Sequence, residues 1–223
     1  MSKHLVRDLD QLQKDILSLA GLVEQSLSKA IRALKERDIV LAREVVQGDT
    51  LIDAEENHIT EECLKVLALH QPVAIDLRRI TSVLMICTDL ERMGDLAEEI
   101  AERAMSLCRP PFFPVPEGVQ RMADLASTMV RQSLDSFVSL DVKLAMRVVR
   151  MDDEVDRYNR ELIQELVKVM NDSPANIEHG LSVFSAIRHI ERIADHATNI
   201  AEDVIYLVEG EIVRHRVEDF GRK

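Results

Sequence analysis

Acidic side chains recur along this sequence at the spacing of one helical turn, in two related pairs of segments. Segment 42–53 (AREVVQGDTLID) is similar to segment 145–156 (AMRVVRMDDEVD), and segment 90–104 (LERMGDLAEEIAERA) is similar to segment 190–204 (IERIADHATNIAEDV). Because residues four apart share one side of a helix, each segment would place two carboxylates together. These pairs are Asp49 and Asp53, Glu91 and Asp95, Asp152 and Asp156, and Glu191 and Asp195.

The acids lie on or beside the apolar stripes of their predicted helices. Positions where the heptad pattern predicts apolar side chains hold Asp49, Glu56, Asp152 and Asn159 instead. Glu102 shares a face with Glu91 and Asp95, within roughly 40° around a helix, and Glu202 repeats this placement in the second half. A buried carboxylate without a partner costs on the order of several kcal/mol, so it must be paired, protonated or bound to a metal.

Two interpretations of these acids remain open from the residues alone. Arginines could neutralise them, and the candidates are Arg43, Arg92, Arg147 and Arg192. Alternatively, four carboxylates from two helices would bind a hard cation such as iron, manganese, magnesium or calcium, whereas zinc prefers histidine or cysteine. So many neighbouring acids would repel one another, which favours a bridged multinuclear cluster.

The elements that position these acids are predicted to be long helices. Aromatic residues make up only 3% of the chain and good helix formers dominate, while 46% hydrophobic and 30% charged residues are typical of a globular protein. The repeat predicts an all-α fold of two tandem antiparallel three-helix bundles, with six long helices. We expect a first bundle over 1–108, a proline-rich linker over 109–118, a second bundle over 119–210 and a polar tail over 211–223.

The composition also excludes several classes of function. A net charge of -12 and the shortage of aromatic residues argue against nucleic acid as a partner. No run approaches the roughly 18 apolar residues of a membrane span, and the N-terminal segment lacks the apolar stretch of a signal peptide. Cys63, Cys87 and Cys108 are interpreted as reduced thiols of a cytoplasmic protein.

Other candidate sites are weaker. Glu55 and His58 form one E-x-x-H motif, but ferritin-like di-iron bundles need two, and the second half offers none at the corresponding place. His196 follows Asp195 and could add a ligand, although we expect an ordinary surface histidine. No nucleophile motif or glycine-rich phosphate loop is present, so no catalytic residue is assigned. The role of Asp76, Arg78 and Arg79 is left open.

The chain resembles the PhoU family of bacterial phosphate-uptake and phosphate-signalling regulators. The resemblance is carried by segments 72–80 (PVAIDLRRI), 88–101 (TDLERMGDLAEEIA) and 190–204, and by the repeated D-x-x-x-D segments. It covers nearly the whole chain, from about residue 5 to residue 208. It implies paired three-helix bundles whose E(D)-x-x-x-D motifs bind multinuclear metal clusters, with iron or zinc foremost and manganese, magnesium or calcium as alternatives.

By this resemblance the metal ligands are Asp49, Asp53, Glu91 and Asp95 in the first half and Asp152, Asp156, Glu191 and Asp195 in the second. Weaker candidates are Glu56, Glu99, Glu102, Asn199 and Glu202. Asn199 in place of Glu99 and Arg160 in place of Asn57 suggest that the two sites differ in charge. The family further implies a homodimeric adaptor rather than an enzyme. It would link the ATPase subunit of a phosphate ABC transporter to a phosphate-sensing histidine kinase, reach the membrane only through these partners, and repress the phosphate-starvation response.

Alternative functions stay open beside this one. A metal-dependent phosphohydrolase would use similar ligands, because carboxylate-bridged metals activate water. A purely structural bundle would pair its acids with arginines and keep its stability in chelator. Distant relatives associated with Pit-type phosphate transporters share the bundle but match these motifs less well.

Overall fold

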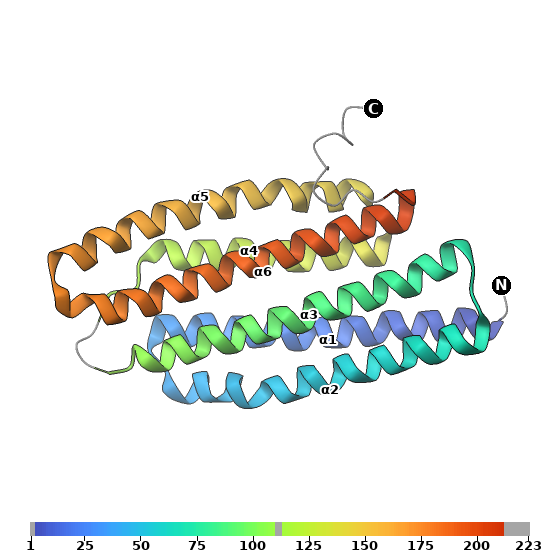
Figure 1. The fold of residues 1–223 in the computed structure, drawn as a ribbon, viewed down its shortest axis with the longest axis horizontal. Helices are drawn as coiled ribbons and strands as arrows, with labels where there is room; N and C mark the ends of the chain where they lie inside the picture. Colours follow the sequence, from blue (N-terminus) through green and yellow to red (C-terminus); the bar gives the residue numbers. More distant parts are fainter. Residues whose placement is uncertain (1–2, 110–112, 212–223) are drawn as a thin grey trace.

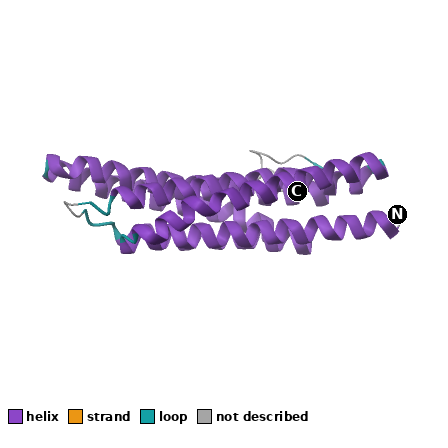
Figure 2. Ribbon diagram, turned by 90° about the horizontal axis from the view of Figure 1, so that it is seen from below, coloured by secondary structure: helices purple, strands orange, loops and turns teal. Residues whose placement is uncertain are grey.

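A computed structural model describes residues 3–109 and 113–211, which form an all-α structure (Figure 1). Six long helices follow one another, with one 3₁₀ turn (Pro174–Asn176) before the last. They are α1 (Lys3–Glu36), α2 (Ile39–His70), α3 (Ala74–Ser106), α4 (Glu117–Ser139), α5 (Val142–Asp172) and α6 (Ile177–Glu209). Short loops connect them, and the helices run along the length of an elongated molecule (Figure 2).

Local sequence explains where these helices begin and end. The side chain of Asp38 accepts hydrogen bonds from the backbone N–H groups of Val40 and Leu41, and Asp141 caps α5 in the same way. Before Pro72, Gln71 ends α2 in the left-handed region with φ 46°. The six predicted helices are therefore confirmed.

Each half of the chain forms one antiparallel three-helix bundle. Helices α1, α2 and α3 pack together, as do α4, α5 and α6, around apolar residues buried at helical spacing. The two bundles lie side by side through α3 and α6, with a smaller contact between α1 and α4, so α2 and α5 form the outer edges (Figure 1). Cys63, Cys87 and Cys108 are free, as expected.

Polar contacts show that α3 and α6 meet with a pseudo-two-fold relation. Glu99 Oε2 lies 3.0 Å from Nδ1 of His189, while Asn199 Nδ2 donates to Asp89 Oδ1 over 3.3 Å. In the internal repeat, position 89 corresponds to 189 and position 99 to 199. The same two positions therefore meet on both sides of the interface, as in a symmetric dimer formed within one chain.

The connection between the bundles is attached to both of them. Phe113 is buried, and its carbonyl accepts a 2.7 Å hydrogen bond from Nη2 of Arg37 at the end of α1. The carbonyl of Arg109 lies 3.2 Å from Nε2 of His179 in α6. Part of the predicted linker (110–112) and most of the predicted tail (212–223) lie outside the described residues. Within the described ranges, no helix is long and apolar enough to cross a membrane.

Candidate metal centres

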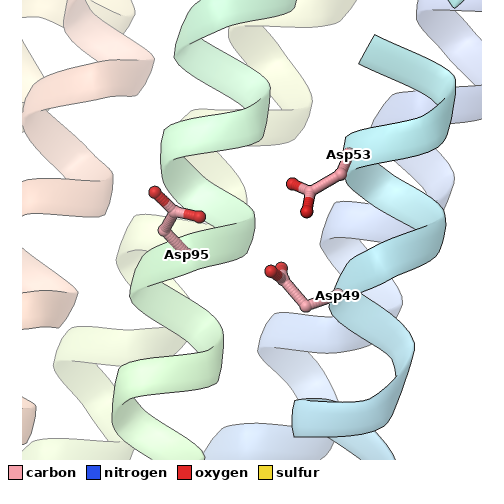
Figure 3. Close-up of side chains that lie close together, drawn as sticks. All are labelled: Asp49, Asp53 and Asp95. Atoms are coloured by element: carbon pink, nitrogen blue, oxygen red, sulfur yellow. The ribbon is translucent and has the colours of Figure 1, made fainter. Parts of the chain in front are cut away.

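Helices α2 and α3 bring three aspartates of the first half together. Asp49 and Asp53 project from α2 toward Asp95 on α3 (Figure 3), and one carboxylate oxygen from each lies within 4.8 Å of the others. The helices approach closely here because residue 94 is glycine: a Cβ atom at Gly94 would lie 3.0 Å from Ile52 and 3.3 Å from Asp49 Oδ1. A larger residue than glycine at position 94 would therefore push α3 away from α2.

Asp49 is the most buried member of this group, and its burial is uncompensated. The residue is 9% exposed, and its Oδ1 atom is buried without a hydrogen-bond partner. Burial, reinforced by the charges of Asp53 and Asp95, raises the pKa of Asp49 to about 6. Such a carboxylate is poised to bind a proton or a cation.

Glu91 and Asp95 have an arginine partner as well as acidic neighbours. Arg92 Nη1 donates to Asp95 Oδ2 over 3.0 Å, and its Nε lies 3.5 Å from Glu91 Oε2. Burial raises the pKa of Glu91 and the charge of Asp95 adds to this, while Arg92 opposes it. Since the Arg92 side chain is 55% exposed, solvent weakens these pairs. Arginine pairing therefore accounts for part of this site but not for Asp49.

Glu98 also interacts with this group through its charge and was not among the predicted ligands. Burial raises its pKa, and Asp49 makes the next largest contribution. A signal was present, because Glu98 lies three residues after Asp95 and seven after Glu91 on one helix face. Its counterpart is Thr198, so the internal repeat gives no signal for it.

The weaker candidates of the first half fall in different places. Glu56 is half-buried, accepts a 3.2 Å hydrogen bond from Thr60, and raises the pKa of Glu91 through its charge. Glu102 is exposed and 3.8 Å from Arg103, although its charge acts on Glu98. Glu99 faces the other bundle instead, where it pairs with His189.

In the second half, α5 and α6 bring the corresponding acids near one another. Burial is the main cause that raises the pKa of Asp152 to about 6, and the charges of Asp195 and Asp156 add to it. The pKa of Glu191 is also raised, first by burial, and so is the pKa of Asp195, although Asp195 taken as a whole residue is exposed. These acids do not meet the 4.8 Å spacing of the first group, which alone does so among residues 3–109 and 113–211.

The acids of the second half form a hydrogen bond with a neutral side chain and ion pairs with arginines. Asn159 is buried and its Nδ2 donates to Glu191 Oε1 over 2.7 Å. Arg188 forms an ion pair with Glu191, and Arg160 Nη1 lies 3.5 Å from Asp156 Oδ2. Arginine pairing therefore occurs here too, but through Arg188 and Arg160 rather than through the arginines expected from the sequence.

The remaining candidates belong to other surroundings. His196 is not an ordinary surface histidine: its side chain is 18% exposed, and Nδ1 lies 2.7 Å from Asp89 Oδ1. Asn199 binds the same carboxylate, so both residues stabilise the α3–α6 interface. Glu202 is buried in α6, unlike exposed Glu102. Sequence reasoning missed Asp89 because its partners lie more than a hundred residues away.

Comparison with known proteins gives concordant results. The PhoU domain model matches residues 16–104 and 119–204, one copy in each bundle. The chain is 42% identical over 218 residues to a phosphate-specific transport system accessory protein PhoU homolog of Pseudomonas putida, covering 96% of this chain and 84% of the relative. A homolog of that name from Aquifex aeolicus is 41% identical over 95% of this chain and 96% of its own length.

Solved structures agree with these matches. The crystal structure of PhoU from Pseudomonas aeruginosa superposes with a TM-score of 0.87 at 40% identity, covering 92% of this chain and 99% of that one. The phosphate transport system regulatory protein PhoU from Streptococcus pneumoniae gives 0.88 at 32% identity, covering 94% and 99%. With both repeats matched and nearly the full length aligned, the chain belongs to the PhoU domain family.

Proposed function

We propose that this protein is a regulatory accessory protein of phosphate-specific transport. The observation that carries the proposal is the match, over almost the whole chain, to relatives whose names state that role. As the family resemblance implies, the protein would act in the cytoplasm as a homodimeric adaptor between the transporter's ATPase subunit and a phosphate-sensing histidine kinase. It would thereby repress the phosphate-starvation response when phosphate is plentiful.

Metal binding is the second part of the proposal, and the residues suit it. Asp49, Asp53, Glu91 and Asp95 offer the oxygen donors that hard cations prefer, with Glu56 and Glu98 nearby. The unpartnered Oδ1 of Asp49 supports a cation here, since an uncompensated buried carboxylate is otherwise costly. Asp152, Asp156, Glu191 and Asp195 would form the second centre.

A bound cation would supply positive charge between two helices of one bundle. At the first centre, α2 contributes Asp49 and Asp53 while α3 contributes Glu91 and Asp95, so binding would relieve repulsion among them and fasten α2 to α3. The cation would thereby hold α2, at the outer edge of the molecule, against α3. We assign a structural and regulatory role to these centres, not a catalytic one.

The adaptor role is tested by binding. Metal-loaded protein should bind the cognate transporter ATPase subunit or the kinase's cytoplasmic domain in isothermal titration calorimetry. The Asp49→Asn/Asp95→Asn variant should bind more weakly, and Glu61→Gln, an exposed acid further along α2, serves as the matched control. Absence of binding to both partners would contradict the adaptor role. Phosphoester hydrolysis lost in Glu91→Gln would point to an enzyme instead.

A further inference from the structure

The two carboxylate centres derive from one repeat but no longer carry equal charge. Glu56 of the first half corresponds to Asn159 in the second, and Glu98 corresponds to Thr198. The second centre therefore lacks two acids that act on the first, and gains one, because Asp153, which raises the pKa of Asp152, stands where the first half has Thr50. This difference in charge would cancel only if the second centre also had fewer nearby cations than the first.

The cations differ in the opposite sense. Arg188 stands where the first half has Thr88, and Arg160 stands where it has Asn57. Both arginines contact acids of the second centre: Arg188 pairs with Glu191, and Arg160 approaches Asp156 Oδ2 to 3.5 Å. Arg92 and Arg192 occupy corresponding positions and do not account for the difference.

Geometry separates the two centres further. In the first, three acid oxygens already converge within 4.8 Å and the buried Oδ1 of Asp49 has no hydrogen-bond partner. In the second, Glu191 Oε1 accepts a hydrogen bond from Asn159, and Glu191 Oε2, which has no hydrogen-bond partner, is held in an ion pair with Arg188. A cation at the second centre must compete with these contacts for Glu191, whereas at the first centre it competes with the exposed Arg92.

We propose that the two centres fill in a fixed order, with the first-half centre binding metal more tightly than the second-half centre. The inference rests on the proposed metal binding. Losing one charge-assisted contact on binding corresponds to roughly a tenfold weaker affinity or more. The second centre thus fills only at a higher metal concentration than the first. One chain would therefore bind metal over two separate concentration ranges.

The test is calorimetric titration of chelator-stripped full-length protein with Mn²⁺, with free Mn²⁺ followed in parallel by electron paramagnetic resonance. Wild type should show two phases with dissociation constants separated by about tenfold or more. Asp95→Asn should remove the tight phase, and Asp195→Asn should remove the weak one. Arg188→Thr, which restores the first-half residue, should tighten the weak phase, whereas Arg157→Thr, an exposed arginine of α5 paired with Glu154 and Glu161, should leave both phases unchanged.

Each other outcome overturns the inference. Equal affinities, or loss of the tight phase in Asp195→Asn, would overturn the filling order while leaving metal binding intact. An unchanged weak phase in Arg188→Thr would overturn the stated cause. No Mn²⁺ binding by a wild type that remains folded by circular dichroism would overturn the metal proposal and this inference together.

Discussion

Asp49 and Asp89 are buried to the same extent, and their surroundings make them different kinds of residue. Asp49 is 9% exposed and Asp89 is 8% exposed. Asp89 Oδ1 lies 2.7 Å from His196 and accepts from Asn199, whereas Asp49 Oδ1 has no hydrogen-bond partner. A buried acid with such partners stabilises an interface, while a buried acid among other acids is available for a ligand.

The largest expected difference between the two aspartates is in the stability lost when each is replaced by alanine. Asp89→Ala should destabilise the protein by about 2–3 kcal/mol, because it leaves the polar groups of half-buried His196 and Asn199 without their acceptor. Asp49→Ala in metal-free protein should cost far less, since it removes a carboxylate that is itself destabilising. Urea unfolding at pH 7.5 measures both values. Equal losses would show that Asp49 is a structural residue like Asp89.

A second way to test the comparison is to alter the close approach of α2 and α3 beside Asp49. Gly94→Ala should destabilise the protein by about 1–2 kcal/mol, because the added Cβ atom meets Ile52 and Asp49 Oδ1. Gly48→Ala is the matched control: open space surrounds that position, so the better helix former should stabilise α2 by up to about 1 kcal/mol. Thermal unfolding of both variants checks the sign of each change.

A smaller effect is expected in how the unfolding free energy of the metal-free protein depends on pH. The pKa of Asp49 is raised to about 6, above its value of 3.8 in the unfolded chain, so the folded state binds more protons between these values. Its unfolding free energy should therefore rise as the pH falls from 7.5 to 5, by about 1 kcal/mol once solvent screening is included. Asp49→Asn should reduce this slope, and Glu61→Gln should not. Stability that falls steadily on acidification in this range would contradict the raised pKa.

The fold was accessible from sequence because it depends on local patterns. Helical periodicity, Asp38 and Asp141 as caps, and Pro72 after α2 are each read within one segment, and the internal repeat supplied the two-bundle plan. The acid pair within each helix was also predictable from its four-residue spacing, but which helices share a site was not, because that depends on how the helices pack.

The contacts that could not be predicted from the sequence are those at the interface between the two bundles. Glu99 was considered as a ligand by its helix position, but the crossing of α3 and α6 places it beside His189. Asp89 and His196 are 107 residues apart and no local pattern connects them. Glu98 has no acidic counterpart in the second half, where Thr198 stands, so the internal repeat gives no signal for it.

The measurement that tests the central claim most directly is the metal content of untagged protein by inductively coupled plasma mass spectrometry, compared with the Asp95→Asn/Asp195→Asn variant. The account predicts more than one iron, zinc or manganese ion per wild-type chain and a loss of that metal in the variant. Metal-free wild type whose melting temperature is unchanged by chelator would contradict it, and the acids would then be understood as partners of Arg92, Arg160 and Arg188.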